Sequence, residues 1–318
     1  MAEENIFSIN EAVLSNLKRL SKEQSILTEL RIYELYDIAL EMAENSSRLF
    51  DDGLDAYEIL SLLSESIELG DYPIFDKFEP AFGDLITRCH KTLSSTDRIL
   101  LTELYLDICR RNFRALTEGD FLPGAYGEET FTYVRNSLAD EAYDVFSQDF
   151  QEPRVRYSHT LKDAAAAVSS GEVTYCLLPL EERGGARLHT VSDIIFRNDF
   201  KINSVISVFG IDGNADIKYA LVSKSFIVPE RAEDDDMYLE IRLGKDSDTS
   251  LSELCYAVDR LEMSVYRVNT LTFETEGESE TYFSVVIKGG KGDFSPILTY
   301  MTLFLRDFVP VGIYKNIE

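Results

Sequence analysis

A charged loop is the stretch of this chain best suited to binding chemistry. Glu181, Glu182 and Arg183 follow a short apolar run, and Gly184 and Gly185 come next. Carboxylates can move protons, and an arginine can hold a carboxylate through paired hydrogen bonds. Adjacent side chains diverge in an extended segment, so Glu181 and Glu182 do not predict a paired acid and base. The loop is therefore a candidate binding site, and Glu181 is a candidate catalytic group.

The sequence contains no motif for a cofactor or a metal site, so we expect neither. The segment Lys288 to Gly292 (KGGKG) lacks the spacing of a phosphate-binding loop and predicts a turn. A zinc site would need cysteines or histidines paired at short spacing, and the four cysteines are solitary. The neighbours Cys89 and His90 cannot both face one side of a helix. The cysteines predict reduced core residues of a cytoplasmic protein.

The composition argues against two classes of partner. The 318 residues contain 31 Lys and Arg against 57 Asp and Glu, which gives a net charge of -26. Such a surface repels nucleic acid and anionic membranes unless a basic patch gathers somewhere, and the sequence holds no such patch. No apolar run approaches the roughly 20 residues that a membrane span needs. We expect a protein without nucleic-acid or membrane partners.

The first part of the chain predicts a bundle of helices over residues 1–119. Capping patterns begin at Ser8 and at Ser21, each followed by leucines at helical spacing, so we expect two helices there. Further helices are expected over 55–69 and 78–91, and a last one from near Ser95.

Residues 120–229 alternate short helices with apolar strands, which predicts an α/β layer. Helices are expected over 136–150, 161–169 and 191–196, and strands over 154–157, 174–178, 202–209 and 217–223. After a polar linker, residues 237–318 predict a ferredoxin-like βαββαβ unit. Two helices cover one face of its sheet, and pairing with a second copy is one common way to cover the other.

The order of these parts, with three motifs, resembles the prephenate dehydratase family. The segment Tyr126 to Thr132 (YGEETFT) is similar to the family's opening Gly-x-x-Gly-Thr-Phe-Ser/Thr motif, with Glu129 in place of the second Gly. A second motif of the family ends in Val-Pro-x-Glu-Asn-Ser-x-x-Gly, and it is similar to residues 164–171 and 175–185. The resemblance implies a lobe of a periplasmic-binding-protein-like fold over 120–229 and an ACT-like domain over 237–318.

The resemblance implies two groups of ligand-binding residues. The dehydratase motifs fall on the first group and the phenylalanine-binding motifs of the ACT domain on the second. The first comprises Thr130, Thr132, Glu181, Arg183, Gly184, Gly185 and Lys218, and the second Thr249, Ser250, Leu251 and Asn269. Thr130, Glu181 and Lys218 are the candidate catalytic residues. A capping role for Thr249 and Ser250, and a place on the sheet surface for Asn269, stay open.

Departures from the family favour binding over catalysis. The family's Thr-Arg-Phe, which supplies its catalytic threonine, falls on Lys218, Tyr219 and Ala220, and no suitable hydroxyl remains. The chain also has no room for the second lobe between the strands over 202–209 and 217–223. We expect a non-catalytic regulatory or binding protein, a homodimer through its tail, that senses an aromatic amino acid or a related carboxylate. The alternatives are a divergent prephenate dehydratase, a lyase forming phenylpyruvate, and a purely structural interaction protein.

Overall fold

The computed structural model describes residues 11–69, 93–122, 124, 127–182, 186–209, 216–229, 236–244, 251–275, 278–289, 293–305 and 308–317. The chain forms two compact units. One contains residues 1–54 and 62–115, and the other contains residues 55–61 and 116–318. The expected helix over 78–91 lies outside the described residues.

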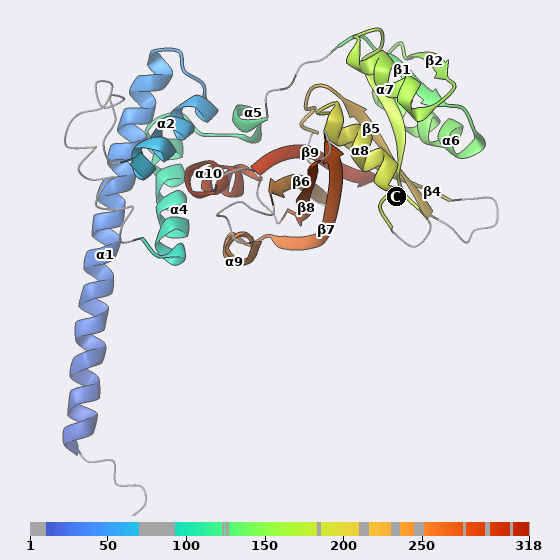
Figure 1. Ribbon diagram of the computed structural model, residues 1–318. Coiled ribbons are helices and arrows are strands. Elements are labelled where there is room, and N and C mark those ends of the chain that lie inside the picture. The colour runs from blue at the N-terminus through green and yellow to red at the C-terminus, as the bar shows by residue number, and fades with distance from the viewer. Residues whose placement is uncertain are drawn as a thin grey trace, which may run out of the picture. The chain divides into compact units, whose positions relative to one another are not determined.

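Helices make up the described part of residues 11–115. They are α1 (Glu11–Asp51), α2 (Ala56–Leu69) and α4 (Ser95–Asn112), shown in Figure 1. The predicted break at Ser21 is wrong, because α1 is a single helix of 41 residues. Lys, Glu and Gln after Ser21 favour a helix interior as much as a first turn, and no Gly or Pro interrupts them. The predicted starts at 55 and near Ser95 are confirmed, and Ser94 caps α4 in a capping box with Asp97. The capping pattern at Ser8 lies outside the described residues.

The second unit begins with a short helix and an α/β half. The elements are α5 (Glu118–Phe121), β1 (Thr130–Val134), α6 (Ser137–Phe146), η2 (Ser147–Asp149), β2 (Arg154–Ser158), α7 (Leu161–Ser169), β3 (Tyr175–Glu181), α8 (His189–Arg197), β4 (Lys201–Phe209) and β5 (Asp216–Ser223). Local capping sets the helix starts, as Asn136 accepts from two amides of α6 and Thr160 forms a capping box with Asp163. Gly171 ends α7 with a φ of +80°, which only glycine adopts freely.

Three parallel strands and one antiparallel pair form this half of the sheet. β2, β1 and β3 run parallel, and β5 joins β3 in antiparallel pairing. β4 pairs antiparallel with β5 from Lys201 with Ser223 to Phe209 with Asp216. Only residues 210–215 separate the two strands, too few for another lobe. One core cluster lies on the α6 face and another on the face of α7 and α8.

The last part of the chain is a βαββαβ unit, as predicted. Its elements are β6 (Met237–Gly244), α9 (Leu251–Arg260), β7 (Ser264–Thr275), β8 (Glu278–Lys288), α10 (Ser295–Phe304) and β9 (Phe308–Ile317). Side chains alternate between the faces of the strands, so Leu239, Ile241 and Leu243 share one face of β6. All three are almost completely buried. Tyr238, Glu240 and Arg242 lie on the opposite face.

The two halves share one mixed sheet of nine strands in the order β2-β1-β3-β5-β4-β9-β6-β8-β7. They meet where β4 pairs parallel with β9, and Ile202 there lies opposite Gly312. A Cβ at position 312 would lie 2.3 Å from the Ile202 carbonyl oxygen, so the junction requires glycine.

The sheet face that we expected a second copy to cover is occupied within the chain. Tyr238, Val286 and Tyr314 of the βαββαβ unit belong to the same core cluster as α7, α8 and β3. Phe196 of α8 stacks on Phe273 of β7 with 4.2 Å between ring centroids. The need for cover therefore gives no support to a dimer through this face, and a dimer through the tail stays a prediction.

Candidate functional site

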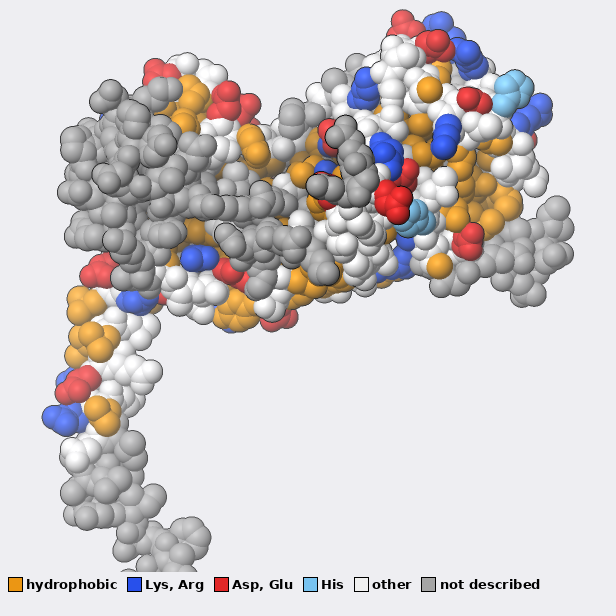
Figure 2. All heavy atoms as spheres, viewed as in Figure 1, with side chains coloured by type: hydrophobic (Ala, Val, Ile, Leu, Met, Phe, Trp, Pro, Cys, Tyr) orange, Lys and Arg blue, Asp and Glu red, His pale blue; other side chains and the backbone are white. Residues whose placement is uncertain are grey.

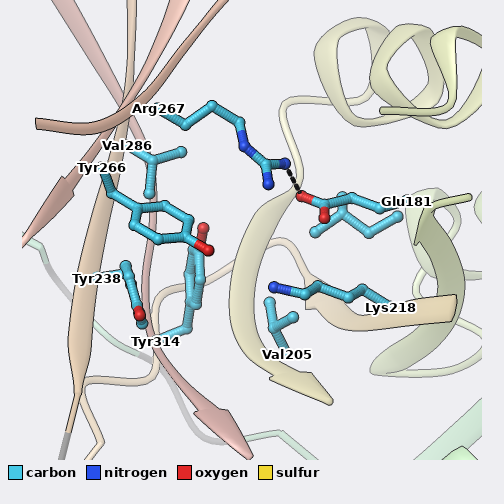
Figure 3. A pocket seen from close by; sticks show the side chains of 9 residues that line it. Glu181, Val205, Lys218, Tyr238, Tyr266, Arg267, Val286 and Tyr314 are labelled. Carbon is cyan, nitrogen blue, oxygen red and sulfur yellow. Dashed lines mark hydrogen bonds and ion pairs between the residues drawn. The ribbon is translucent and has the colours of Figure 1, made fainter. Parts of the chain in front are cut away.

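The predicted residues Glu181 and Lys218 line one small cavity in the second unit. Figure 3 shows Lys218, Glu181 and Val205 from the α/β half facing Tyr238, Tyr266, Arg267, Val286 and Tyr314 from the βαββαβ half. The strands bring the two predicted residues together, because Glu181 of β3 pairs with Lys218 of β5. The cavity volume is about 20 Å³, which is room for roughly one water molecule. We call it the junction cavity.

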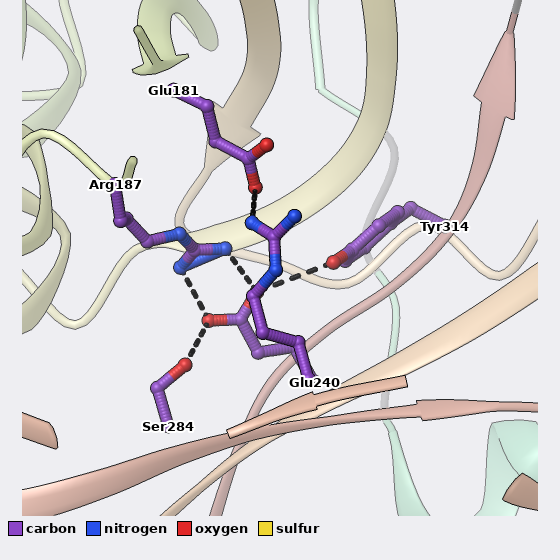
Figure 4. Close-up of polar contacts among 6 residues, drawn as sticks. Glu181, Arg187, Glu240, Ser284 and Tyr314 are labelled. Atoms are coloured by element: carbon purple, nitrogen blue, oxygen red, sulfur yellow. Dashed lines mark hydrogen bonds and ion pairs between the residues drawn. The ribbon is translucent and has the colours of Figure 1, made fainter. Parts of the chain in front are cut away.

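A buried ion pair lies beside the junction cavity. Arg187 donates from Nη1 and Nη2 to the two carboxylate oxygens of Glu240, at 2.5 and 2.6 Å. The two side chains are only 7% and 2% exposed. Ser284 donates to Oε1 at 2.9 Å, and the Tyr314 hydroxyl donates to Oε2 at 3.3 Å. Figure 4 shows that the arginine reaches from the α/β half onto the sheet of the βαββαβ half.

These neighbours also fix the charge states around Glu240. Burial lowers the pKa of Arg187 most strongly, but Glu240, Tyr314 and Glu181 together outweigh it, so the pKa lies above its ordinary value. Burial, reinforced by the charge of Glu240, raises the pKa of Tyr314 well above its ordinary value. Arg187 is therefore a permanent cation and Tyr314 a neutral donor, which suits a fixed bidentate pair.

Glu181 already has a cationic partner. Arg267 of β7 donates from Nη1 to Glu181 Oε1, and Figure 3 shows this contact. Glu181 Oε2 is buried and accepts no hydrogen bond within the described part of the chain. The carboxylate of Glu181 is thus largely neutralised by its own chain, with one oxygen still directed to the small cavity.

Thr130 and Thr132 do not join this site. Thr132 is buried and lies 2.7 Å from the Ser158 hydroxyl, and Thr130 accepts from the Thr174 amide at 3.0 Å. Phe131 pairs with Tyr175, six residues before Glu181 on β3. At about 3.3 Å per residue, the threonines lie roughly 20 Å from Glu181. They tie β1 to its neighbours instead.

Both predicted groups are only partly described. Arg183, Gly184 and Gly185 of the loop, and Thr249 and Ser250 before α9, lie outside the described residues. Leu251 is the first residue of α9 and is half-buried. Asn269 lies opposite Ser284 in the sheet, and its buried Nδ2 donates to no described acceptor. Asn269 therefore faces the ion pairs of the junction rather than open surface.

A larger cavity, which the sequence analysis missed, lies on the α6 face of the sheet. Its volume is about 470 Å³, within the range of sites for small molecules. Phe146, Phe150, Leu221 and Ile227 supply apolar walls, and the polar groups come from Asp149, Asn203, Ser204 and Lys315; Val228 and Pro229 complete the described lining. We call it the α6 pocket.

Fixed hydrogen bonds and ring contacts hold the walls of the α6 pocket. Asn203 donates from Nδ2 to the Ser223 hydroxyl at 2.8 Å, and its Oδ1 accepts from the Ile227 amide at 2.9 Å. Phe150 packs edge-on against Phe131 at 4.8 Å between ring centroids. The pocket is therefore largely pre-formed, as binding sites for small molecules usually are.

Weak sequence signals pointed to some of the missed residues. Glu240 is a carboxylate inside the apolar strand of residues 237–243, which predicts a buried partner. Asp149 and Phe150 end a predicted helix and carry no motif. No group of His, Cys, Asp or Glu in the described ranges could hold a metal ion. None of the helices in those ranges is long and apolar enough to cross a membrane.

The chain resembles known proteins in fold alone. No protein-family model matches it, and no curated protein sequence matches it. It is similar to prephenate dehydratase from Streptococcus mutans, with a TM-score of 0.47 and 13% identity over 59% of this chain and 99% of that one. The prephenate dehydratase in complex with L-Phe from Arthrobacter aurescens gives 0.44 and 12%, over 58% and 89%. GqqA, described as a novel type of quorum quenching acylase, gives 0.44 and 15%, over 59% and 96%.

Proposed function

We propose that this protein binds an aromatic amino acid or a related small carboxylate, without catalysis, and serves a regulatory role. The α6 pocket carries the proposal, because its volume of about 470 Å³ suits a ligand of this size. The junction cavity, with about 20 Å³, is too small for such a molecule. The ligand site thus differs from the one that the sequence motifs imply.

The chemistry of the α6 pocket suits an amino acid with a ring. Phe146 and Phe150 offer ring surfaces against which an aromatic side chain can pack. Lys315 supplies positive charge for a carboxylate, and Asp149 supplies negative charge for an ammonium group. A zwitterion with an apolar ring combines these three features.

The surroundings of Lys218, Tyr219 and Ala220 support binding without dehydration. The Tyr219 hydroxyl donates to Asn136 Oδ1 at 3.4 Å, at the start of α6, and Ala220 is fully buried. Neither residue offers a hydroxyl to the junction cavity, where a dehydratase would need a proton donor for the departing hydroxyl. Lys218 is the one member of the three that lines this cavity.

The motifs and the order of the elements support a more specific assignment of the fold. The chain would be a one-lobed relative of prephenate dehydratase, with an ACT-like βαββαβ unit. The unpaired cysteines Cys109 and Cys176 suit the cytoplasm. Two alternatives would replace this proposal. The protein would be a divergent dehydratase or a purely structural interaction protein.

Isothermal titration with phenylalanine, tyrosine, tryptophan and prephenate tests the proposal, with prephenate turnover followed in the same samples. A ligand at ~100 times its dissociation constant also stabilises the native state by ~2.7 kcal/mol, which thermal unfolding detects. Ser204→Phe fills the α6 pocket and should abolish binding. Lys315→Met removes a charged contact and should weaken binding about tenfold.

Lys162→Met is the matched control, because Lys162 is an exposed lysine of α7 away from the pocket lining. It should bind like the unaltered chain. Prephenate turnover would favour the divergent enzyme, and no binding of any of the four compounds would favour the structural protein. Binding that survives Ser204→Phe in a folded variant would place the ligand elsewhere.

A further inference from the structure

The first half of α1 is uncovered. Of the side chains that the structure describes from residue 16 to residue 34, every one is exposed. Among them, Ile26, Leu30 and Tyr33 are 46%, 54% and 68% exposed, and Figure 2 shows hydrophobic side chains along this part of the helix. A helix of this length with so much exposed apolar surface is typical of a binding surface.

These three residues form a stripe of their own. At 100° per residue, Ile26, Leu30 and Tyr33 lie within about 60° of one another around the helix. The buried residues of α1 that follow, Leu35 and Met42, lie roughly 150–170° away from the middle of the stripe, on the side where α4 packs. The spacing of four and then three residues is that of a coiled-coil seam. Packing against α4 therefore leaves the seam open.

Charges of opposite sign flank the seam. Arg19 and Asp37 lie on the same line as the three apolar residues, one seven residues before Ile26 and the other four residues after Tyr33. Lys22 lies beside Arg19, and Glu34 lies beside Asp37. Arg19 contacts Glu23 at 3.9 Å with both side chains more than half exposed, a weak pair that can exchange partners.

We propose that α1 pairs with α1 of a second copy of this chain in antiparallel orientation through Ile26, Leu30 and Tyr33. In the register that places Ile26 against Leu30 of the second copy, Arg19 meets Asp37 twice, and Tyr33 lies beside Glu23 of the second copy. Parallel pairing would place like charges together at both ends, which is unfavourable. Residues 18–37 give a seam of about 30 Å. The proposal is independent of the ligand in the α6 pocket.

Sedimentation equilibrium of the full chain tests the pairing. We expect a dimer, and Leu30→Asp should convert it to a monomer with unchanged circular dichroism, because the Leu30 side chain is 54% exposed. Tyr57→Asp is the control, because Tyr57 is an equally exposed apolar residue, 56% exposed, on α2. This variant should stay dimeric. A monomeric unaltered chain, or a dimer that survives Leu30→Asp, would overturn the proposal.

Charge reversals test the orientation. Arg19→Glu and Asp37→Arg should each weaken the dimer, roughly tenfold, because each turns two attractions into repulsions. The double variant restores both contacts in the antiparallel arrangement and should regain the original affinity. If neither single variant weakens the dimer, or if the double variant is weaker than both, the antiparallel pairing is wrong.

Discussion

The two cavities of the larger unit lie on one sheet and differ in how much room they leave. In the junction cavity, Glu181 is held by Arg267, and the neighbouring Glu240 is held by Arg187, Ser284 and Tyr314. In the α6 pocket, Asp149 and Lys315 stand at the edge of a space of about 470 Å³ with aromatic walls. The first cavity is filled by its own chain, and the second leaves room for another molecule.

The difference teaches that a concentration of charged residues need not mark a binding site. Each buried charge at the junction meets an opposite charge from the other half of the sheet, so these charges fix how the halves join. A buried pair is costly to desolvate and costlier to break, which makes it a determinant of structure. The space with fewer charges is the better candidate for a ligand.

Removal of Glu240 is expected to have the largest effect on stability, and it tests whether the charges at the junction determine the structure. Glu240→Ala leaves Arg187 buried without its partner, and we expect a loss of about 3–5 kcal/mol in the free energy of unfolding. Chemical denaturation followed by circular dichroism measures it. The double variant Arg187→Met with Glu240→Leu removes both charges and should recover most of that loss. Equal losses in the single and double variants would mean that the pairing itself is unimportant.

The strand junction offers the next test. Gly312→Ala places a methyl group against the Ile202 carbonyl, and the strands must move apart to accept it. We expect a loss of about 1–3 kcal/mol, the usual range for overpacking. Thermal unfolding measures it, with Gly53→Ala as a partial control, because a Cβ at Gly53 meets no atom within 4 Å. Gly53 has a positive φ, so a small loss there is expected from the backbone alone.

The ion pair between Arg31 and Asp97 is more exposed than the pair between Arg187 and Glu240, and we expect it to contribute less to stability. The hydrogen bond from Arg31, assisted by Ser94 and opposed by partial burial, lowers the pKa of Asp97 from 3.8 to about 2. The unfolded chain then binds a proton at higher pH than the folded chain, so this stability is complete above pH 4 and is lost between pH 4 and 2. Because Arg31 is 48% exposed, we expect only about 1 kcal/mol. Asp97→Asn should remove this part of the acid dependence; an unchanged profile would contradict it.

Lys218→Met should have the smallest effect. Lys218 lines the junction cavity, and its side chain forms no hydrogen bond or ion pair with the residues that the structure describes. We expect a change within about 0.5 kcal/mol in stability, as for substitutions away from key contacts. Ligand affinity, measured by titration, should be unchanged. A tenfold loss of affinity would move the binding site to the junction.

Most of the element order could be predicted from the sequence because its signals are local, although β1 (Thr130–Val134) is not among the expected strands. Alternation over 280–287 and the caps at Ser94 and Thr160 depend on residues within a few positions of one another. The break at Ser21 failed because the same residues suit a helix start and a helix interior. A helical spacing of leucines fits both cases, so it does not tell a helix start from a helix interior.

The site could be predicted only where the sheet register follows from neighbouring strands. Glu181 and Lys218 lie side by side, since β3 and β5 pair directly. Arg187 and Glu240 are 53 residues apart, and their contact depends on how β9 joins β4. The α6 pocket is assembled from four separate segments whose residues have no shared spacing. Such contacts follow from tertiary packing and leave no pattern in the sequence.

Amide hydrogen exchange with and without phenylalanine tests the central claim that the ligand enters the α6 pocket. We predict slower exchange in segments 143–150, 203–208 and 225–229, which form the pocket, and no change around the junction cavity. Protection confined to 178–182, 186–188 and 264–268 would show that the junction opens to hold the ligand, and it would contradict this account.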